Sequence, residues 1–436
     1  MRSSININSL YVVGLAHRYP PYTHEPDEFD DLVKRLYPQH ATLGGLKKLM
    51  AMNRRTGIKS RGIAFDTSNW TKEDATPPSI HTLSQTFRAV GVDLAVATCI
   101  EAIQEAQVSA ADVTHVVAVT CTDQGNPGYD LHVCQKLGLR SDVQRTLLHG
   151  VGCAGGLSAL RTGANLAAAE SQKRRPARVL VMACEICTLF LRAELLAASQ
   201  DDALHIAPAL FSDGAAALVV CNGLALRKDQ HPIFELQEWG SMSVPATISH
   251  MSYMVKKNAG LIATLTKDVP STAVSAILPM LATLRNATQT PQEKLSWSKL
   301  GATEFDWAIH PGGAAILTGS QKALGLTDEH MRASLEVYNN YGNSSSPSVL
   351  IVLDKLRHMG KGRDYVVSTS FGPGMIIEMC ILERCCAQGT PPLRSSMRWQ
   401  AHPWLWLQSR LMRLMREYEM THRISGKKHR HGIVER

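Results

Sequence analysis

The hydrophobic and polar positions of the 436-residue chain alternate between two patterns. Short apolar runs bounded by polar or glycine residues predict buried strands. Those strands are expected near the N-terminus up to residue 15 and at 114–120, 177–183, 232–240, 305–310, 364–370 and 374–382, and the apolar run 207–221 closes the first half. Longer segments with apolar residues at helical spacing predict helices. Those helices are expected at 27–36, 43–59, 82–107, 129–137, 157–170, 189–199, 272–287, 313–324 and 346–358. The alternation of strand and helix predicts a layered α/β fold.

The alternation occurs twice along the chain, which indicates two similar α/β halves. We place the first half at residues 1–228 and the second at 229–388. A tail at 389–436 has a different character, because tryptophans and leucines alternate there with regularly spaced arginines. Such a stretch is typical of a basic amphipathic helix at a membrane surface, although it also fits packing on the protein body or partial disorder.

Charge separates the tail from the rest of the chain. The formal net charge is +8, but Thr390 to Arg436 holds ten Lys or Arg and three Asp or Glu, so the tail contributes +7. The remaining chain is nearly neutral, which argues against a nucleic-acid-binding groove.

The compartment is predicted from three further observations. The chain has no apolar run long enough for a membrane span, and its N-terminus lacks the features of a secretory signal. The ten cysteines are scattered through apolar segments, which fits reduced thiols better than a disulfide framework. We therefore expect a cytoplasmic protein, with the C-x-x-C pair Cys184 and Cys187 too isolated for a zinc site.

Cys153 is the strongest candidate for a reactive residue. It lies in a glycine-walled turn between a short extended segment and the helix expected at 157–170. A helix start stabilises a thiolate, which is the nucleophilic form of cysteine. Two other interpretations remain open at this point: a small buried hydrophobe, and a dinucleotide-binding turn formed by Gly150, Gly152 and Gly155 with Glu185 as the ribose-binding acid.

Two more polar residues stand in glycine-bounded corners. His310 follows a buried strand and precedes Pro311-Gly312-Gly313, and Asn343 follows Gly342 and precedes three serines. Taken singly, His310 fits a core histidine and Asn343 fits a turn or a helix cap. Their occurrence together with Cys153 favours a catalytic set.

These motifs resemble those of the type III polyketide synthases, the chalcone and stilbene synthase family. The resemblance covers about residues 8 to 384. The matching stretches are Gly152–Gly156, Leu210–Ala216, Lys267–Pro270, Trp307–Gly313, Gly342–Ser345 and Phe371–Gly374. The resemblance implies a thiolase-like fold with two duplicated halves in an αβαβα arrangement. It also implies that Cys153 is the acyl-carrying nucleophile and that His310 and Asn343 face it.

The resemblance assigns further residues to substrate binding. Phe211 matches an aromatic gate, while Ala263 stands where plant members carry a second gating phenylalanine. The other positions that it assigns to the substrate site are Cys187, Phe190, Ser345, Gly372, Pro373 and Gly374. Small side chains at Ala263 and Cys187 are expected to open space for a long starter, whereas Phe190 acts in the opposite direction.

The resemblance also implies substrates and partners. Lys48 and Arg55 match positions that pair with coenzyme A phosphates, although Ala51 replaces a third basic residue. The expected enzyme is a fungal or microbial homodimer that condenses a fatty acyl-CoA with malonyl-CoA to an alkylpyrone, alkylresorcinol or alkylresorcylic acid, without metal or redox cofactor. The alternatives are a ketoacyl-carrier-protein synthase, a dinucleotide-dependent oxidoreductase and a catalytically silent membrane-associated partner, with peripheral membrane contact assigned to the tail.

Overall fold

The fold is built on one large mixed sheet. The computed structural model describes residues 6–39, 42, 44–256, 260–287 and 296–385, so the expected 389–436 tail lies outside the described residues. Within those residues, nine strands form a sheet in the order β11-β12-β13-β8-β1-β7-β6-β4-β5. The strands of the first half are β5 (Gln144–Leu148), β4 (His115–Val119), β6 (Arg178–Glu185), β7 (Gly214–Asn222) and β1 (Leu10–Arg18). Those of the second half are β11 (Asp306–Ile309), β12 (Tyr365–Gly372), β13 (Ile376–Arg384) and β8 (Phe234–Ser243).

The pairing pattern repeats between the two halves. In the first half β4 and β6 pair in parallel, and β6-β7 and β7-β1 pair antiparallel. In the second half β11 and β12 pair in parallel, and β12-β13 and β13-β8 pair antiparallel. The halves meet where β1 pairs antiparallel with β8, from Leu10 opposite Leu236 to Val12 opposite Phe234. This repetition confirms the predicted duplication of an α/β half.

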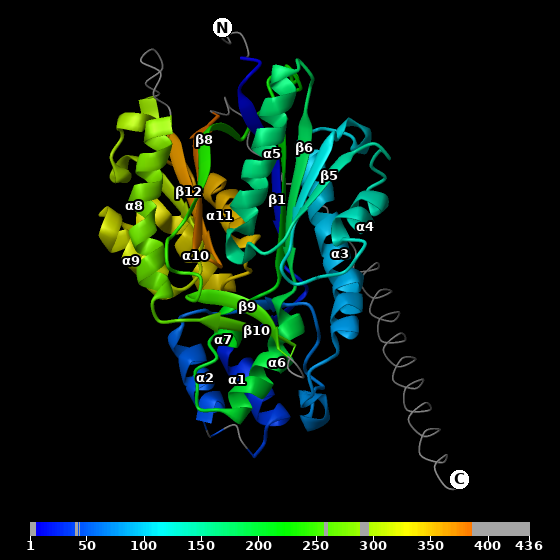
Figure 1. The fold of residues 1–436 in the computed structure, drawn as a ribbon, viewed down its shortest axis with the longest axis vertical. Helices are drawn as coiled ribbons and strands as arrows, with labels where there is room; N and C mark the ends of the chain where they lie inside the picture. The colour runs from blue at the N-terminus through cyan, green and yellow to red at the C-terminus, as the bar shows by residue number, and fades with distance from the viewer. Residues whose placement is uncertain (1–5, 40–41, 43, 257–259, 288–295, 386–436) are drawn as a thin grey trace. The chain divides into compact units, whose positions relative to one another are not determined.

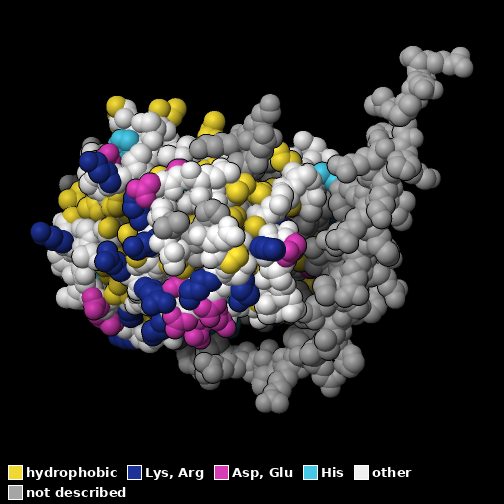
Figure 2. Space-filling view, turned by 90° about the horizontal axis from the view of Figure 1, so that it is seen from below, with side chains coloured by type: hydrophobic (Ala, Val, Ile, Leu, Met, Phe, Trp, Pro, Cys, Tyr) yellow, Lys and Arg dark blue, Asp and Glu magenta, His cyan; other side chains and the backbone are white. Residues whose placement is uncertain are grey.

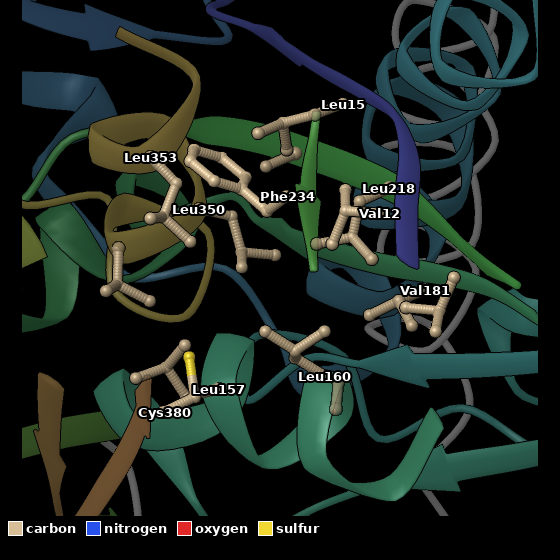
Figure 3. Close-up of a cluster of buried hydrophobic side chains, with 14 of the residues drawn as sticks. Val12, Leu15, Leu157, Leu160, Val181, Leu218, Phe234, Leu350, Leu353 and Cys380 are labelled. Carbon is tan, nitrogen blue, oxygen red and sulfur yellow. The ribbon is translucent and has the colours of Figure 1, made fainter. Parts of the chain in front are cut away.

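Two helices lie between the halves of the sheet. Helix α5 (Gly155–Gln172) contacts β4, β6 and β7 of the first half and β12 and β13 of the second. Helix α11 (Ser348–Arg357) contacts β1, β7, β11 and β12 (Figure 1). A helix that is apolar on all sides is stable only when it is enclosed, and α11 buries eight of its ten residues. Figure 3 shows Leu157 of α5, Leu350 of α11 and Phe234 of β8 in the resulting central core.

Further helices cover the outer faces and complete the layers. The first half is covered by α3 (Ile80–Glu105), which contacts β1, β6 and β7, and α4 (Tyr129–Lys136) packs on α3. The second half is covered by α8 (Val269–Ala287), which contacts β8 and β13 and packs on α9 (Ala314–Leu324). The order helix, sheet, helix, sheet, helix is the predicted αβαβα arrangement (Figure 1).

A group of shorter elements lies at the lower end in Figure 1. Its members are β2 (Tyr22–His24), α1 (Pro26–Leu36), α2 (Gly44–Arg55), β3 (Arg61–Ile63), α6 (Leu191–Gln200), α7 (Ala207–Leu210), β9 (Met251–Lys256) and β10 (Gly260–Leu265). Helices α1, α2 and α6 share a separate apolar core that includes Phe29 and Leu195. Seen from this side in Figure 2, Lys and Arg side chains lie among Asp and Glu side chains. Two ion pairs of these elements are Arg54–Asp30 and Lys48–Asp202, so the charges of Arg54 and Lys48 are partly neutralised.

Most of the predicted elements are confirmed to within a few residues. Those missed are the β9-β10 hairpin, the short β2-β3 pair and α10 (Arg332–Tyr341). The strands have only three to six residues, too few for a period to be recognised. Helix α10 is missed although its buried residues Ala333, Ser334, Val337 and Tyr338 stand at helical spacing. Among the helices that the structure describes, none combines the length and the apolar character needed to cross a bilayer.

Candidate active site

Cys153 lies in the turn that starts the central helix. The short 3-10 turn Gly152–Ala154 leads directly into α5, and Cys153 is buried there. Glycine is required behind it, because a Cβ on Gly156 would stand 2.3 Å from the carbonyl oxygen of Ser346. Because glycine has no side chain, the Cys153 turn packs closely against the turn that carries Asn343. The predicted position of Cys153 at a helix start is confirmed.

Asn343 is held by its own turn with its amide group directed to the thiol. The Asn343 Oδ1 atom accepts hydrogen bonds from the Ser345 N–H at 2.8 Å and from Ser348 Oγ at 3.3 Å. The Asn343 Nδ2 group is then the end that faces Cys153, and it donates to Cys153 Sγ at 3.9 Å. Ser345 adopts a left-handed φ of 59° in this tight turn, and its Oγ lies 3.5 Å from Cys153 Sγ.

His310 follows β11 and is anchored through its main chain. Its N–H donates to the Thr369 carbonyl at 2.8 Å, and its carbonyl accepts from the Gly312 N–H at 2.8 Å. The imidazole is 1% exposed, and neither ring nitrogen finds a hydrogen-bond partner among the described residues. A buried polar group without a partner is costly, so this ring is a candidate to bond a substrate or the thiol.

The three residues line one cavity of about 480 Å³. Burial raises the pKa of the Cys153 thiol to about 11, even though Ser345, Asn343 and the Cys153 main chain lower it. Burial also lowers the pKa of His310 to about 3. At neutral pH the site therefore holds a neutral thiol and a neutral imidazole. The helix start was expected to stabilise the thiolate, but burial raises the pKa of Cys153 instead.

Phe211 separates this cavity from a second one. The residue lines both the 480 Å³ cavity, which we call the outer cavity, and an inner cavity of about 40 Å³. Its ring meets Tyr253 edge to face, with the ring centres 6.0 Å apart. The Phe211 main chain also forms a parallel bridge with Asn343: the Asn343 N–H donates to the Leu210 carbonyl, and the Ser212 N–H donates to the Asn343 carbonyl, both at 2.9 Å.

Besides Phe211, four of the expected substrate residues line the inner cavity: Cys187, Phe190, Ala263 and Ser345. The inner cavity is small, and the aromatic side chains of Phe190 and Tyr253 are among its lining residues. A volume of about 40 Å³ holds about three water molecules. Sequence reasoning missed Tyr253, which lies opposite Ala263 in the β9-β10 hairpin.

Gly372, Pro373 and Gly374 lie behind the nucleophile turn and not among the residues that line the two cavities. A Cβ on Gly372 would stand 2.3 Å from the Val151 carbonyl oxygen, and one on Gly152 would stand 2.7 Å from the Pro373 ring. This loop therefore supports the Cys153 turn, while its neighbour Phe371 lines the outer cavity.

The two residues expected to bind coenzyme A differ in their surroundings. Arg55 lines the outer cavity together with Lys267, which sequence reasoning did not single out although it opens the Lys267–Pro270 motif. The Lys48 ammonium group instead donates to the Asp202 carboxylate at 2.6 Å and to the Asp202 carbonyl at 2.7 Å. Lys48 is not among the residues that line either cavity.

The other interpretations of the Cys153 region do not fit the structure. Glu185, the candidate ribose-binding acid, is fully buried and accepts hydrogen bonds from Thr120, Thr122, Ser346 and the Cys121 N–H. Cys184 is buried in β6 and its thiol donates to the Gly91 carbonyl. Within the described ranges, no group of three or more His, Cys, Asp or Glu side chains is placed to hold a metal ion.

Comparison with known proteins agrees with this geometry. Residues 41–223 match the N-terminal domain of the chalcone and stilbene synthases, and residues 235–386 match their C-terminal domain. The chain is 44% identical to the type III polyketide synthase pspB of Penicillium soppii, over 86% of this chain and 96% of that protein. The chain belongs to the type III polyketide synthases.

Two further fungal proteins are similar to this polyketide synthase. It is 34% identical to the acylalkylpyrone synthase csyB of Aspergillus oryzae, over 86% of this chain and 94% of that protein. The crystal structure of ORAS, a fungal type III polyketide synthase, is 40% identical with a TM-score of 0.81, over 86% of this chain and 99% of that one. CsyB complexed with CoA-SH is 34% identical with a TM-score of 0.81, over 86% of this chain and all of that one. The thiolase-like fold and the activity of a condensing acyltransferase follow from this membership.

Proposed function

We propose that Cys153 carries the growing acyl chain and that His310 and Asn343 serve its chemistry. In the loading step, Cys153 Sγ attacks the carbonyl carbon of an acyl-CoA thioester. The thiol proton passes to an unpaired ring nitrogen of His310 and then to the departing CoA sulfur. The observation that carries this proposal is the buried His310 imidazole, whose nitrogens have no other partner in the described part of the chain and share a cavity with the thiol.

Chain extension also uses the side chains of His310 and Asn343, here as hydrogen-bond donors. Malonyl-CoA loses carbon dioxide, and the electron pair of the broken carbon–carbon bond forms an enolate. The Asn343 Nδ2 group and an N–H of His310 donate to the enolate oxygen. The enolate carbon attacks the thioester carbonyl on Cys153 and displaces the thiolate, so the chain grows by two carbons. Neither step consumes electrons or needs a metal, which supports the expectation that no cofactor takes part.

The proposed starter is a fatty acyl-CoA. Cyclisation of the extended chain gives an alkylpyrone, an alkylresorcinol or an alkylresorcylic acid. The similarity to a protein named acylalkylpyrone synthase supports the pyrone among these products. The apolar lining of the outer cavity, with Met52, Leu204 and Met251, supports an alkyl substituent.

Coenzyme A is proposed to enter through the outer cavity. Arg55 and Lys267 line this cavity, and each can donate to a phosphate. The CoA complex of the related CsyB supports this assignment. We also propose that the enzyme is a homodimer in the cytoplasm, on the grounds of its family and its CoA substrates.

Acyl transfer to Cys153 can be tested by intact-protein mass spectrometry. The purified protein is incubated with hexanoyl-CoA in the absence of malonyl-CoA, and we expect one added hexanoyl group that maps to the Cys153 peptide. Cys153→Ala should gain none. Cys134→Ala, a buried cysteine that lines neither cavity, is the matched control and should acylate normally.

An acyl group on the Cys153→Ala protein would overturn the assignment. Malonyl-CoA and malonyl-carrier protein, offered in turn to the loaded enzyme, separate the proposal from a ketoacyl-carrier-protein synthase. We expect carbon dioxide to be released from malonyl-CoA, and release only from the carrier-bound form would favour the alternative.

A further inference from the structure

The inner cavity contains a charged side chain that the proposed chemistry does not use. Arg61, in β3, lines this cavity and is 2% exposed. Its Nη1 group donates to the Ala209 carbonyl at 3.3 Å, and its guanidinium lies 5.0 Å from the centre of the Phe29 ring. Its Nη2 atom is buried and has no hydrogen-bond partner among the described residues.

Among the described residues, no carboxylate is shown in a hydrogen bond or ion pair with Arg61. The acid that acts on it electrostatically is Asp30, and the Asp30 carboxylate already accepts hydrogen bonds from Arg54 at 2.7 Å and Asn53 at 3.3 Å. Burial lowers the pKa of Arg61 to about 10, which reflects the cost of holding its charge away from water. The Arg61 guanidinium would not stabilise a plain alkyl chain in this cavity, because an alkyl chain cannot accept a hydrogen bond. A buried donor without an acceptor costs free energy.

A second charged residue of the inner cavity determines which acceptor fits. Glu194 lines the same cavity, and its Oε1 atom accepts a hydrogen bond from the Ala263 N–H at 2.6 Å. Glu194 is 4% exposed, and its carboxylate would repel an anionic ligand in this small space. A neutral oxygen can accept from Arg61 Nη2 without this repulsion.

We propose that the inner cavity binds an oxygen-bearing acyl group, whose neutral carbonyl oxygen accepts a hydrogen bond from Arg61 Nη2. This inference rests on the proposed function, since it requires an acyl chain on Cys153 that extends past Phe211. It narrows the substrate from any fatty acyl group to one with a ketone near its thioester. The ketone has two possible sources: a 3-oxoacyl starter, or the first condensation of a plain acyl starter with malonyl-CoA.

Binding is tested first with the Cys153→Ala protein, which holds the thioester without reacting. Calorimetric titration compares 3-oxohexanoyl-CoA with hexanoyl-CoA, which have equal chain lengths. We expect the oxo compound to bind about tenfold more tightly, as befits a hydrogen bond to a charged donor. Equal affinity for the two compounds would overturn the proposal, and this measurement needs no change at Arg61.

The role of Arg61 is tested by Arg61→Met, which keeps the approximate side-chain volume and removes the charge. We expect the ratio of kcat/KM for 3-oxohexanoyl-CoA to that for hexanoyl-CoA to fall at least about tenfold. Arg61→Lys should restore part of the ratio. Arg55→Met is the matched control at the outer cavity, where it should lower kcat/KM for both starters by the same factor.

The products distinguish the two sources of the ketone. If the starter supplies it, Arg61→Met changes the choice of starter. If condensation supplies it, the variant should release chains after one extension even when hexanoyl-CoA is the starter. An unchanged ratio together with an unchanged product distribution would overturn the proposal, whereas failure of the wild-type protein to acylate at Cys153 would instead reject the proposed function.

Discussion

Phe190 is predicted to set the length of the starter chain. Its side chain lines the inner cavity and packs on the outer core between α3 and the first half of the sheet. Replacement by alanine removes the whole ring, which is large compared with a cavity of about 40 Å³. Phe190→Ala should therefore create room for about three further methylene groups of an acyl chain.

The size of the effect follows from apolar burial. Each methylene group transferred from water to the cavity contributes about 0.8 kcal/mol, or about a fourfold change in affinity. Three methylene groups correspond to a gain in kcat/KM of up to about sixtyfold for the longer starter. The cost in unfolding free energy should be about 2 kcal/mol, below that of a fully buried phenylalanine, because Phe190 is only partly buried.

The assay is a competition between saturated acyl-CoA starters of increasing length at fixed malonyl-CoA, with products quantified by mass spectrometry. Phe65→Ala is the matched control, because Phe65 packs against the same core but lines neither cavity. We expect the preferred length to increase by about three carbons in Phe190→Ala and not to change in Phe65→Ala. An unchanged profile in Phe190→Ala, or the same shift in both variants, would refute the reasoning.

Three further predictions concern chemistry and stability. His310→Gln should slow alkylation of Cys153 by iodoacetamide at pH 7 about a hundredfold, because the buried thiol loses its base; an unchanged rate in peptide mapping would contradict this role. Asp306→Asn should lower the unfolding free energy by about 3–5 kcal/mol in urea denaturation, because the buried Asp306 carboxylate binds Arg332, Arg363 and Arg384. Glu329 is an exposed partner of Arg332, so the control Glu329→Gln should lower the unfolding free energy by less than about 1 kcal/mol. Burial lowers the pKa of His24 from 6.5 to about 4, so the unfolded chain takes up the proton first and stability falls as the pH drops from 6.5 to 4, by about 3 kcal/mol. His24→Gln should remove that part of the loss, and identical pH curves for the two proteins would count against it.

The sequence was sufficient to predict most of the framework. Apolar runs such as 177–183 and helical segments such as 157–170 have strong periodicity, and their burial in β6 and α5 follows from it. The positions of Cys153, His310 and Asn343 at turns beside these elements were likewise predicted, because glycine marks the corners where a chain turns sharply.

The residues that line the inner cavity could not all be predicted from the local pattern of apolar and polar residues. Tyr253 lies in a hairpin with no regular apolar period, and its contact with Phe211 joins segments 42 positions apart in the chain. Arg61 follows Arg54, Arg55 and Lys59, and a run of basic residues is typical of solvated surface. The Arg61 side chain is nevertheless buried, where it contacts Phe29 and donates to the Ala209 carbonyl. The pKa of Cys153 also depends on burial from several elements, which no single motif reports.

The main-chain bridge between Phe211 and Asn343 connects the residue that separates the two cavities to the residue whose amide faces Cys153. Phe211 stands at the partition between the cavities, and the hydrogen bonds at its flanking residues hold the main chain of Asn343. Because these hydrogen bonds couple the two main chains, a displacement of the Phe211 segment would also move Asn343, whose amide faces the thiol. The partition between the cavities and the alignment of this donor therefore depend on the same piece of backbone.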